Sequence, residues 1–422
     1  MRRYESYKDS GVEWLGEVPS HWNLIPNKYI FKLRKNVVGK RSSEYDLLSL
    51  SLKGVIKRDM ENPEGKFPAE FDTYQEVKEG DFIFCLFDVE ETPRTVGLSS
   101  YHGMITGAYT IFETNNVDKK FIYYFYLNLD SDKRLKPLYK GLRNTISKET
   151  FFSFNTFIPP LSEQQKIAQF LDDKTAKIDQ AVDLTEKQIA LLKEHKQILI
   201  QNAVTRGLNP DVPLKDSGVE WIGQVPEHWE VSSLGKMLLP VSEKNKPNLP
   251  LLSITRELGV IERDVEDQES NHNFIPDDLS NYKVLKEGQF GMNKMKAWQG
   301  SYGVSRFTGI VSPAYYIFDF IKSVNSRFFH WAIRSKIYIS FFGSASDGVR
   351  IGQWDLSKSR MKSIPFIIPS YTEQVQIADY LDQQAVKIDQ AIALKTAHIE
   401  KLKEYKSVLI NDVVTGKVRV SV

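Results

Sequence analysis

The sequence predicts an α+β protein in which two globular α/β domains are joined, in a pseudo-two-fold arrangement, by two long antiparallel helices that form a coiled-coil spacer. Two observations predict this fold: the chain contains one pattern twice, and each copy ends in a long heptad-patterned stretch without proline or glycine. The predicted segments are a first globular domain at 1–160, a first helix at 161–207, a second globular domain at 208–370 and a second helix at 371–422.

The repetition involves two blocks. Lys8–Trp14 reads KDSGVEW and recurs letter for letter at Lys215–Trp221. A later block that begins with Ile158-Pro159 and contains Glu-Gln recurs from Ile368-Pro369. Between the two blocks, the two copies share only a few short motifs. Two copies with one skeleton and different details suit a protein that reads two different targets with one scaffold.

The globular segments are predicted to be mixed α/β. Short β-like runs such as Phe82–Phe87 and Tyr109–Phe112 lie between Gly, Pro and Asp turns, and helical stretches are expected at Lys119–Leu129 and Ser326–Ser340. The Trp-Gly-Pro-Trp boxes at 14–22 and 221–229 could be ligand sites, but paired tryptophans beside a turn are more often a packed lid that joins a helix to its domain.

Each long helix carries a narrow apolar stripe, which is typical of a coiled-coil seam. Ser162 is the expected N-cap of the first helix, with Gln165 completing a capping box. The predicted seam residues are Leu171, Ile178, Val182, Ile189, Leu192 and Leu199 in the first helix and Leu381, Ile388, Ile392, Ile399, Leu402 and Leu409 in the second.

The length of the helices suggests a spacer. At ~1.5 Å per residue, about 44 residues reach roughly 66 Å, which is comparable to two turns of DNA at roughly 34 Å each. Antiparallel pairing places the end of the chain near its start, whereas a parallel pair needs a long return connection that the sequence lacks. The alternative is that each helix packs on its own domain.

Composition bounds the class of protein. The chain has 422 residues, of which 41% are hydrophobic and 26% charged, so at least two soluble globular domains are expected. We expect no membrane segment and no secretory signal. The single cysteine, Cys85, excludes a disulfide within the chain, and a cytoplasmic location is expected.

The net charge of +2 says little, but its distribution is uneven. Residues 288–370 hold eleven Lys and Arg against three acids, and residues 18–43 hold six against none. Such basic stretches are compatible with a phosphate-binding surface. The simpler interpretation is solvated lysines.

The best candidate for a DNA-binding loop is the stretch 288–303, which interleaves lysine with aromatic and polar residues. Lysine can bind phosphate, and Gln can pair with an adenine edge. The candidates in the second domain are Lys294, Lys296, Trp298, Gln299, Ser301, Arg306 and Arg350. Those in the first domain are Arg94, Thr95, Ser99, His102, Arg143 and Asn144. Taken singly, each motif could also be an ordinary surface turn.

Common catalytic motifs are missing. The sequence has no Gly-x-x-x-x-Gly-Lys-Ser/Thr phosphate loop, no His-Glu-x-x-His and no cysteine–histidine zinc spacing. We therefore predict no catalytic residue, no metal ligand and no cofactor in this chain.

The Ile158-Pro-Pro-Leu-Ser-Glu-Gln block, its copy from Ile368 and the two Gly-Val-Glu-Trp boxes resemble the specificity subunits of type I restriction-modification systems over nearly the whole chain. The resemblance implies that each globular segment is a target recognition domain reading one half of a bipartite, asymmetric site in double-stranded DNA, and that the helices set the spacing. Phe82–Asp88 departs from the more typical polar run, which makes the DNA contacts of the first domain less certain.

The same resemblance implies partners. Two methyltransferase subunits would dock on the helices, and two restriction/translocase subunits would complete the complex. S-adenosylmethionine, ATP and Mg²⁺ would belong to those partners. The alternative functions are a structural tether with two protein-binding modules and a self-sufficient nuclease.

Overall fold

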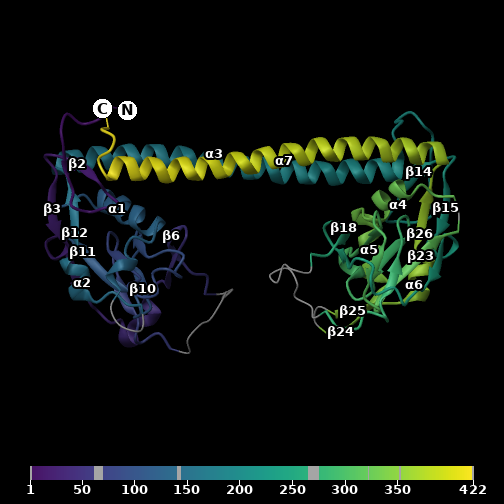
Figure 1. Ribbon diagram of the computed structural model, residues 1–422, viewed down its shortest axis with the longest axis horizontal. Helices are drawn as coiled ribbons and strands as arrows, with labels where there is room; N and C mark the ends of the chain where they lie inside the picture. Colours follow the sequence, from purple (N-terminus) through teal and green to yellow (C-terminus); the bar gives the residue numbers. More distant parts are fainter. Residues whose placement is uncertain are drawn as a thin grey trace. The chain divides into compact units, whose positions relative to one another are not determined.

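The computed structural model describes residues 2–60, 70–139, 144–264, 275–321, 323–350 and 353–420, with the backbone alone at 349, 350 and 353. Contacts group the chain into two compact units. Unit 1 comprises Met1–Thr185 with Ala397–Val422, and unit 2 comprises Glu186–Thr396. Helices α3 (Leu161–Arg206) and α7 (Tyr371–Val414) each contribute to both units (Figure 1). The prediction of two long helices is confirmed.

Unit 1 is built mainly from short strands. Its strands are β1 (Tyr7–Asp9), β2 (Glu17–Pro19), β3 (Asn23–Pro26), β4 (Phe31–Arg34), β5 (Leu48–Ser51), β6 (Gly54–Lys57), β7 (Gln75–Val77), β8 (Phe82–Phe84), β9 (Val96–Leu98), β10 (Gly103–Ile105), β11 (Thr110–Thr114) and β12 (Asn155–Ile158). Its helices, apart from its parts of α3 and α7, are α1 (Lys119–Ser131), α2 (Lys148–Ser153) and the 3-10 turns η1 (Asn27–Tyr29), η2 (Gly39–Glu44) and η3 (Lys136–Leu138).

The centre of unit 1 is an antiparallel sheet of order β4-β11-β8-β9. Aromatic rings pack on it edge to face, with Phe31 5.6 Å from Phe84 and Phe84 5.2 Å from Tyr126 between ring centroids. The Tyr126 hydroxyl donates to Asn27 Oδ1 at 2.7 Å, and Thr156 Oγ1 donates to the same oxygen at 2.9 Å. This buried network fixes the turn that leads from β3 into the sheet.

Unit 2 repeats this plan. Its strands are β13 (Leu214–Asp216), β14 (Gln224–Pro226), β15 (Glu230–Ser233), β16 (Leu238–Val241), β17 (Leu252–Thr255), β18 (Gly259–Glu262), β19 (Lys283–Leu285), β20 (Phe290–Asn293), β21 (Tyr302–Val304), β22 (Gly309–Val311), β23 (Tyr315–Phe320), β24 (Ser346–Arg350), β25 (Gln353–Leu356) and β26 (Pro365–Ile368). Its short helices are α4 (Ser326–Ile333), α5 (Lys336–Ser344), α6 (Lys358–Ser363), η4 (Leu234–Lys236) and η5 (Ala297–Gln299).

The two units share one topology. The central sheet of unit 2 has the order β16-β23-β20-β21, and the pairs β13-β14, β15-β26, β17-β18 and β19-β22 match β1-β2, β3-β12, β5-β6 and β7-β10. The predicted α+β fold class is confirmed. One helix prediction is wrong: the single stretch Ser326–Ser340 is two helices, because the backbone at Ser335 is extended (φ −68°, ψ 156°) between α4 and α5.

Within each unit the two long helices run antiparallel. In unit 2, Lys196 Nζ lies 2.7 Å from Asp389 Oδ1, and Lys395 Nζ donates to Gln188 Oε1 at 2.6 Å. Higher residue numbers on α3 therefore pair with lower residue numbers on α7, as they must in an antiparallel pair. In unit 1, Lys406 Nζ lies 2.6 Å from Asp179.

The ends of the long helices belong to the cores of the units. Leu171 and Ile178 share the unit 1 core with Leu409, whereas Leu381 joins the unit 2 core. The first part of each long helix thus packs on the domain that precedes it, as the alternative interpretation proposed, whereas Leu409 near the end of α7 packs in the core of unit 1. None of the predicted seam residues is exposed. Within the described residues, no helix is long and apolar enough to cross a bilayer.

Candidate nucleic-acid interface

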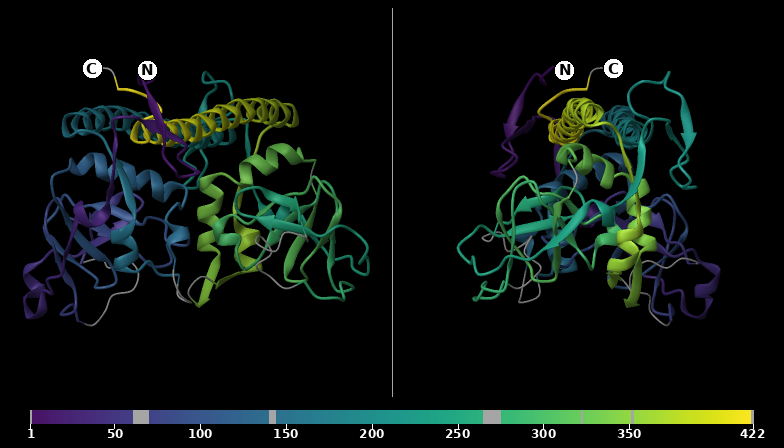
Figure 2. Two further views of the ribbon diagram at one scale, coloured as in Figure 1. Left: turned by 60° about the vertical axis from the view of Figure 1, so that its left-hand side comes forward. Right: turned by 90° about the vertical axis from the view of Figure 1, so that its right-hand side faces the viewer.

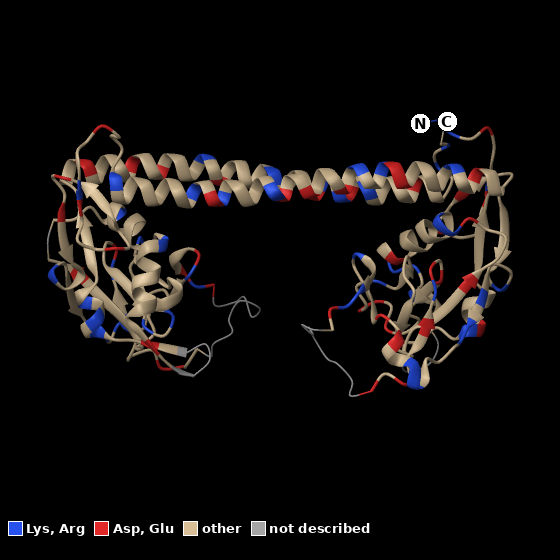
Figure 3. Ribbon diagram, turned by 180° about the vertical axis from the view of Figure 1, so that it is seen from behind, with Lys and Arg blue, Asp and Glu red and all other residues tan. Residues whose placement is uncertain are grey.

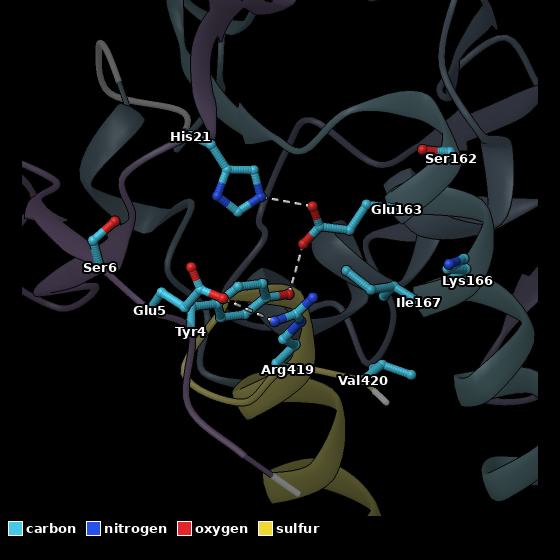
Figure 4. A pocket seen from close by; sticks show the side chains of 10 residues that line it. All are labelled: Tyr4, Glu5, Ser6, His21, Ser162, Glu163, Lys166, Ile167, Arg419 and Val420. Atoms are coloured by element: carbon cyan, nitrogen blue, oxygen red, sulfur yellow. Dashed lines mark hydrogen bonds and ion pairs between the residues drawn. The ribbon is translucent and has the colours of Figure 1, made fainter. Parts of the chain in front are cut away.

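A glutamate at the start of each long helix holds the repeated tryptophan box. Glu163 accepts hydrogen bonds from the Tyr4 hydroxyl (2.7 Å) and Trp22 Nε1 (3.2 Å), and His21 Nε2 lies 2.7 Å from it. Figure 4 shows Tyr4, His21 and Glu163 among the side chains that line a cavity of about 440 Å³. The oxygens of Glu163 already have three partners, and Trp22 is fully buried, as is its counterpart Trp229. The second tryptophan of each box therefore packs as the lid prediction requires, whereas Trp221 is 57% exposed.

Unit 2 builds the same arrangement around Glu373. Trp229 Nε1 donates to it at 3.2 Å, and His228 Nε2 lies at 2.8 Å. Ser370 adds its hydroxyl (2.7 Å) and its backbone N–H (3.1 Å). Burial disfavours the charged carboxylate, but the hydrogen bonds from Ser370, His228 and Trp229 outweigh burial and lower the pKa of Glu373.

The predicted N-cap of the first helix is wrong by two positions. The helix begins at Leu161, and the backbone N–H groups of Glu163 and Gln164 donate to the Pro160 carbonyl. Ser162 therefore lies in the first turn. In the second copy Ser370 occupies the position of Pro160 and forms a reciprocal capping box with Glu373.

The glutamine that follows each glutamate ties the helix to the globular part. Gln164 Oε1 accepts from the Asp118 backbone N–H at 2.9 Å, and its Nε2 donates to the Pro159 carbonyl at 2.8 Å. Gln374 makes the equivalent bonds to Asn325 and Pro369 at 2.8 and 2.9 Å. The duplicated Glu-Gln motif is thus a structural joint.

Charge along the helices does not form a basic surface. Figure 3 shows acidic and basic residues alternating along both α3 and α7. Candidate phosphate-binding residues therefore lie on the short strands and helices of each unit.

The sequence-predicted residues of unit 2 divide into exposed and buried ones. Lys296 and Arg306 are exposed, and Lys294 Nζ lies 3.3 Å from Asp355. Gln299 is half-buried, and the ring of half-buried Trp298 stacks on that of Trp354 with centroids 5.2 Å apart.

Two further predicted residues of unit 2 offer no described side chain to a duplex. Ser301 is 2% exposed, so its side chain lies in the core. Arg350 ends β24, and its side chain lies outside the described residues.

Three of the six predicted residues of unit 1 are engaged inside the protein. Arg94 donates to the Leu52 carbonyl at 2.9 Å and lies 3.8 Å from Asp130. Thr95 is fully buried, and Ser99 is buried with its hydroxyl bonded to the Tyr101 carbonyl.

Two other predicted residues of unit 1 lie outside the core. His102 and Asn144 are exposed, and Asn144 adopts a left-handed backbone conformation (φ 47°). Arg143 lies outside the described residues.

Sequence reasoning missed a cluster of four lysines in unit 2, named here the lysine cluster: Lys244, Lys283, Lys294 and Lys358. Lys283 Nζ donates to the Tyr315 carbonyl at 2.7 Å, and Lys358 Nζ lies 4.5 Å from the centre of the Tyr316 ring. Burial, followed by the charges of Lys244, Lys358 and Lys294, lowers the pKa of Lys283.

The lysine cluster was hidden because its members come from four separate segments of the chain: β19, α6 and two loops. Only the excess of basic residues in 288–370 pointed toward it. Helix α6, which carries Lys358, lies at the end of unit 2 remote from the long helices (Figures 1 and 2).

Neither a metal site nor an acid–base centre stands out. Among the described residues, no group of three or more His, Cys, Asp or Glu side chains could hold a metal ion. Burial, with smaller contributions from Arg334 and Arg306, lowers the pKa of His330 to about 4, and His330 Nδ1 accepts from the Val304 backbone N–H at 3.3 Å. This histidine is a neutral structural acceptor at neutral pH.

Comparison with known proteins agrees with the fold. The family model described as the type I restriction modification DNA specificity domain matches residues 104–194. The chain is 24% identical to the putative type I restriction enzyme MjaX specificity subunit of Methanocaldococcus jannaschii, over 99% of this chain and 97% of that protein. It is 25% identical to the MjaVIII specificity subunit of the same organism, over 75% of each.

Solved structures support the fold. A chain from a study of complex assembly and conformational transition of the type I R-M system has a TM-score of 0.66 at 12% identity, covering 95% of this chain and 99% of that chain. The HsdS subunit from Thermoanaerobacter tengcongensis has a TM-score of 0.50 at 13% identity, covering 95% and 98%.

The duplicated module and the matching family model point to one class: residues 104–194 are similar to a DNA specificity domain, and unit 2 repeats the sheet topology of unit 1. More particularly, the relatives that match over nearly the whole chain are named specificity subunits of type I restriction enzymes, in agreement with the resemblance in the sequence.

Proposed function

We propose that this chain selects a two-part sequence in double-stranded DNA, with one half read by the globular part of each unit. One observation supports this most: two units of one topology carry unlike side chains at equivalent positions. Strand pairing places Thr110 opposite Phe84 in unit 1 and Tyr316 opposite Met292 in unit 2. Thr110 and Tyr316, both only half-buried, are therefore unlike counterparts. A shared scaffold with divergent strand ends suits two different half-sites.

The long helices would set the distance between the half-sites and dock the methyltransferase subunits. Several large apolar side chains on them face away from the partner helix. On α3, Leu191 and Ile198 are 63% and 51% exposed. On α7, Leu394 is 74% and Val408 50% exposed. A partner that covers these side chains would remove apolar surface from water.

Catalysis would belong to the partners. Two methyltransferase subunits would bind S-adenosylmethionine and flip an adenine out of the duplex, as base-modifying enzymes must. Two restriction/translocase subunits would use ATP and Mg²⁺. This chain would be non-catalytic and hold no cofactor.

The test is an exchange of residues 28–157 for the corresponding segment of another specificity subunit, in cells that also produce the methyltransferase. Methylated sites are then mapped by sequencing. We expect one half-sequence to change while the other half and the gap persist. A change in both halves, or in neither, would contradict the assignment of one half to each unit.

The exposed apolar residues on α3 and α7 also favour a second candidate, a structural tether with two protein-binding modules. Filter binding with random-sequence duplex DNA, with and without the methyltransferase, separates the two. A DNA reader is expected to retain DNA in the assembled complex, whereas a tether binds protein partners and retains none.

A further inference from the structure

The lysine cluster is held together by two neighbouring tyrosines at the start of β23. Lys283 bonds to the Tyr315 carbonyl, and Lys358 lies over the Tyr316 ring. Lys294 follows Asn293, which pairs with Tyr315 in the sheet. Lys244 follows Glu243 in the chain. The Glu243 carbonyl accepts a hydrogen bond at 2.9 Å from the backbone N–H of Val284, the residue after Lys283. Four separate segments thus bring four lysines to one end of the sheet, close enough for the charges of the other three to act on Lys283.

Unit 1 has the same backbone at this place but different side chains. Gln75 is the counterpart of Lys283, because Gln75 Nε2 donates to the Tyr109 carbonyl at 2.9 Å as Lys283 donates to that of Tyr315. The residue two positions after Phe84 is Leu86, whereas the residue two positions after Met292 is Lys294.

The other two positions follow from the same correspondence. The Glu76 backbone N–H donates to the Asn36 carbonyl at 2.8 Å, and the Val284 N–H makes the equivalent bond to the Glu243 carbonyl. Asn36 therefore corresponds to Glu243. The next residue in each unit, Val37 or Lys244, corresponds in the same way. Only Lys358 has a basic counterpart: Lys148 follows the N-cap of α2 as Lys358 follows that of α6. Three of four cations are therefore present in unit 2 alone.

Acidic side chains compensate little of this charge. Among the described residues, Asp355 is paired with Lys294 at 3.3 Å, and Glu243 is paired with Lys286 at 2.8 Å. Lys244 and Lys358 are exposed. Like charges held close together are unfavourable unless an anion joins them. Lysine is a compact point charge that suits a phosphate oxygen better than the edge of a base.

We propose that the lysine cluster is a binding site for the phosphates of the DNA backbone that unit 1 lacks, so that unit 2 supplies the larger share of the salt-dependent affinity. The inference rests on the proposed function and adds that the two units contribute unequally to the affinity for DNA. Unit 1 presents valine, glutamine and leucine at the equivalent positions, so its contacts to DNA depend less on counterion release.

The experiment measures binding of the complex with methyltransferase to a random-sequence duplex of about 30 base pairs over a series of KCl concentrations. The variant Lys244→Val with Lys283→Gln places the unit 1 residues in unit 2, and Gln can keep the bond to the Tyr315 carbonyl. The slope of log K against log[KCl] changes by ~0.9 for each phosphate contact. We therefore expect the slope to become shallower by about two.

The matched control is Lys236→Gln with Lys336→Gln, two exposed lysines of unit 2 outside the lysine cluster, which also loses two charges. We expect its slope to stay close to that of the unaltered complex. Lys244→Gln with Lys358→Gln removes two exposed ammonium groups without touching a buried one, so it gives the same answer if the first variant folds poorly.

Two outcomes separate this inference from the proposed function. If the unaltered complex retains DNA and both cluster variants keep its slope, the lysine cluster is not a phosphate site, although the chain still reads DNA. If the unaltered complex retains no DNA at any salt concentration, the proposed function itself fails. Mapped methylation sites should keep both half-sequences in the cluster variants, because phosphate contacts carry no sequence information.

Discussion

Glu163 and Glu373 each gather hydrogen-bond donors from segments far apart in the sequence. Glu373 receives bonds from Trp229, His228 and Ser370, and Glu163 receives the Trp22 and Tyr4 bonds. Each carboxylate therefore fixes the first turn of a long helix against a buried tryptophan. Removing the acceptor would leave an indole N–H without a partner, which costs about 1–3 kcal/mol when the group is buried.

The lowered pKa of Glu373 predicts how its contribution depends on pH. A carboxyl whose pKa is lower in the folded state stabilises the fold above its unfolded pKa of about 4.3, and this stabilisation is lost as the pH falls through the folded value. We expect Glu373→Gln to be less stable than the unaltered chain at pH 7 and the difference to shrink below about pH 4.3. Urea unfolding over a pH series from about 7 down to about 3, which brackets that pKa, measures it.

The control for this prediction is Glu194→Gln, because Glu194 is an exposed acid on α3. We expect it to change stability by less than about 0.5 kcal/mol at every pH. A constant difference between Glu373→Gln and the unaltered chain across the whole pH series would mean that the charge of Glu373 contributes nothing.

Residue identity predicted the joints better than the interface. The repeated Glu-Gln and Trp letters indicated paired structural roles, and hydrogen bonds account for both. Ser301 and Thr95 were plausible DNA contacts by type, yet both are buried, because a small polar side chain satisfies a turn as readily as a phosphate. Lys283 gave no signal, since only the pairing of β19 with β22 and its bond to the Tyr315 carbonyl place it in the lysine cluster.

At the scale of elements, the pairing of α3 with α7 combines an apolar seam with a few cross-helix polar contacts. Lys196 to Asp389 in unit 2 and Lys406 to Asp179 in unit 1 join corresponding positions of the two repeats. Exposed ion pairs contribute ~0.2–1 kcal/mol, so they define the register more than they stabilise it.

Charge reversal tests this register. Lys196→Glu places two acids side by side, and we expect a loss of at most about 1 kcal/mol. Adding Asp389→Lys should restore most of the loss, because the two charges then attract again. Thermal unfolding at low salt measures both variants.

The mismatched control for the charge reversal is Lys196→Glu with Glu404→Lys. Glu404 is an exposed acid further along α7, so this double variant has the same net charge as the matched one but leaves Asp389 facing a glutamate. We expect no recovery in it. Equal recovery in both double variants would show that net charge, rather than the pairing of Lys196 with Asp389, sets the stability.

The long elements were predictable and the short ones less so. Heptads without Pro or Gly indicated both helices over most of their length. The interruption at Ser335 had no such signal, because aromatic residues continue on both sides of it in α4 and α5. Three-residue strands such as β9 and β19 carry too few residues for a clear alternation, and their pairing comes from tertiary contacts.

At the scale of the whole molecule, the proposed spacer role predicts that helix length and DNA gap change together. Deleting 188–194 from α3 and 389–395 from α7 removes matching segments, since Gln188 and Lys395 are hydrogen-bonded. Seven residues at ~1.5 Å each shorten the pair by about 10 Å. At ~3.4 Å per base pair this corresponds to a gap shorter by about three base pairs.

Mapping of methylated sites is the measurement for this deletion. We expect both half-sequences to persist with the shorter gap, and methylation to be weaker because about three base pairs also turn one half-site about the duplex axis. Replacing the exposed Lys193 and Glu194 by Ala keeps the length and should keep the gap. An unchanged gap after the deletion would refute the spacer role.

In unit 1, Arg2 and Arg419 meet at a place where the equivalent backbone of unit 2 is continuous. Arg419 N–H donates to the Arg2 carbonyl at 2.8 Å just beyond α7, whereas Gly207 to Leu214 runs uninterrupted from α3 into β13. The elements between these points therefore follow one another in a circular order. A gene that joins the codon of Arg419 to that of Arg2 through a short linker, and that begins between Gly207 and Leu214, should encode the same fold with the order of its two globular domains reversed.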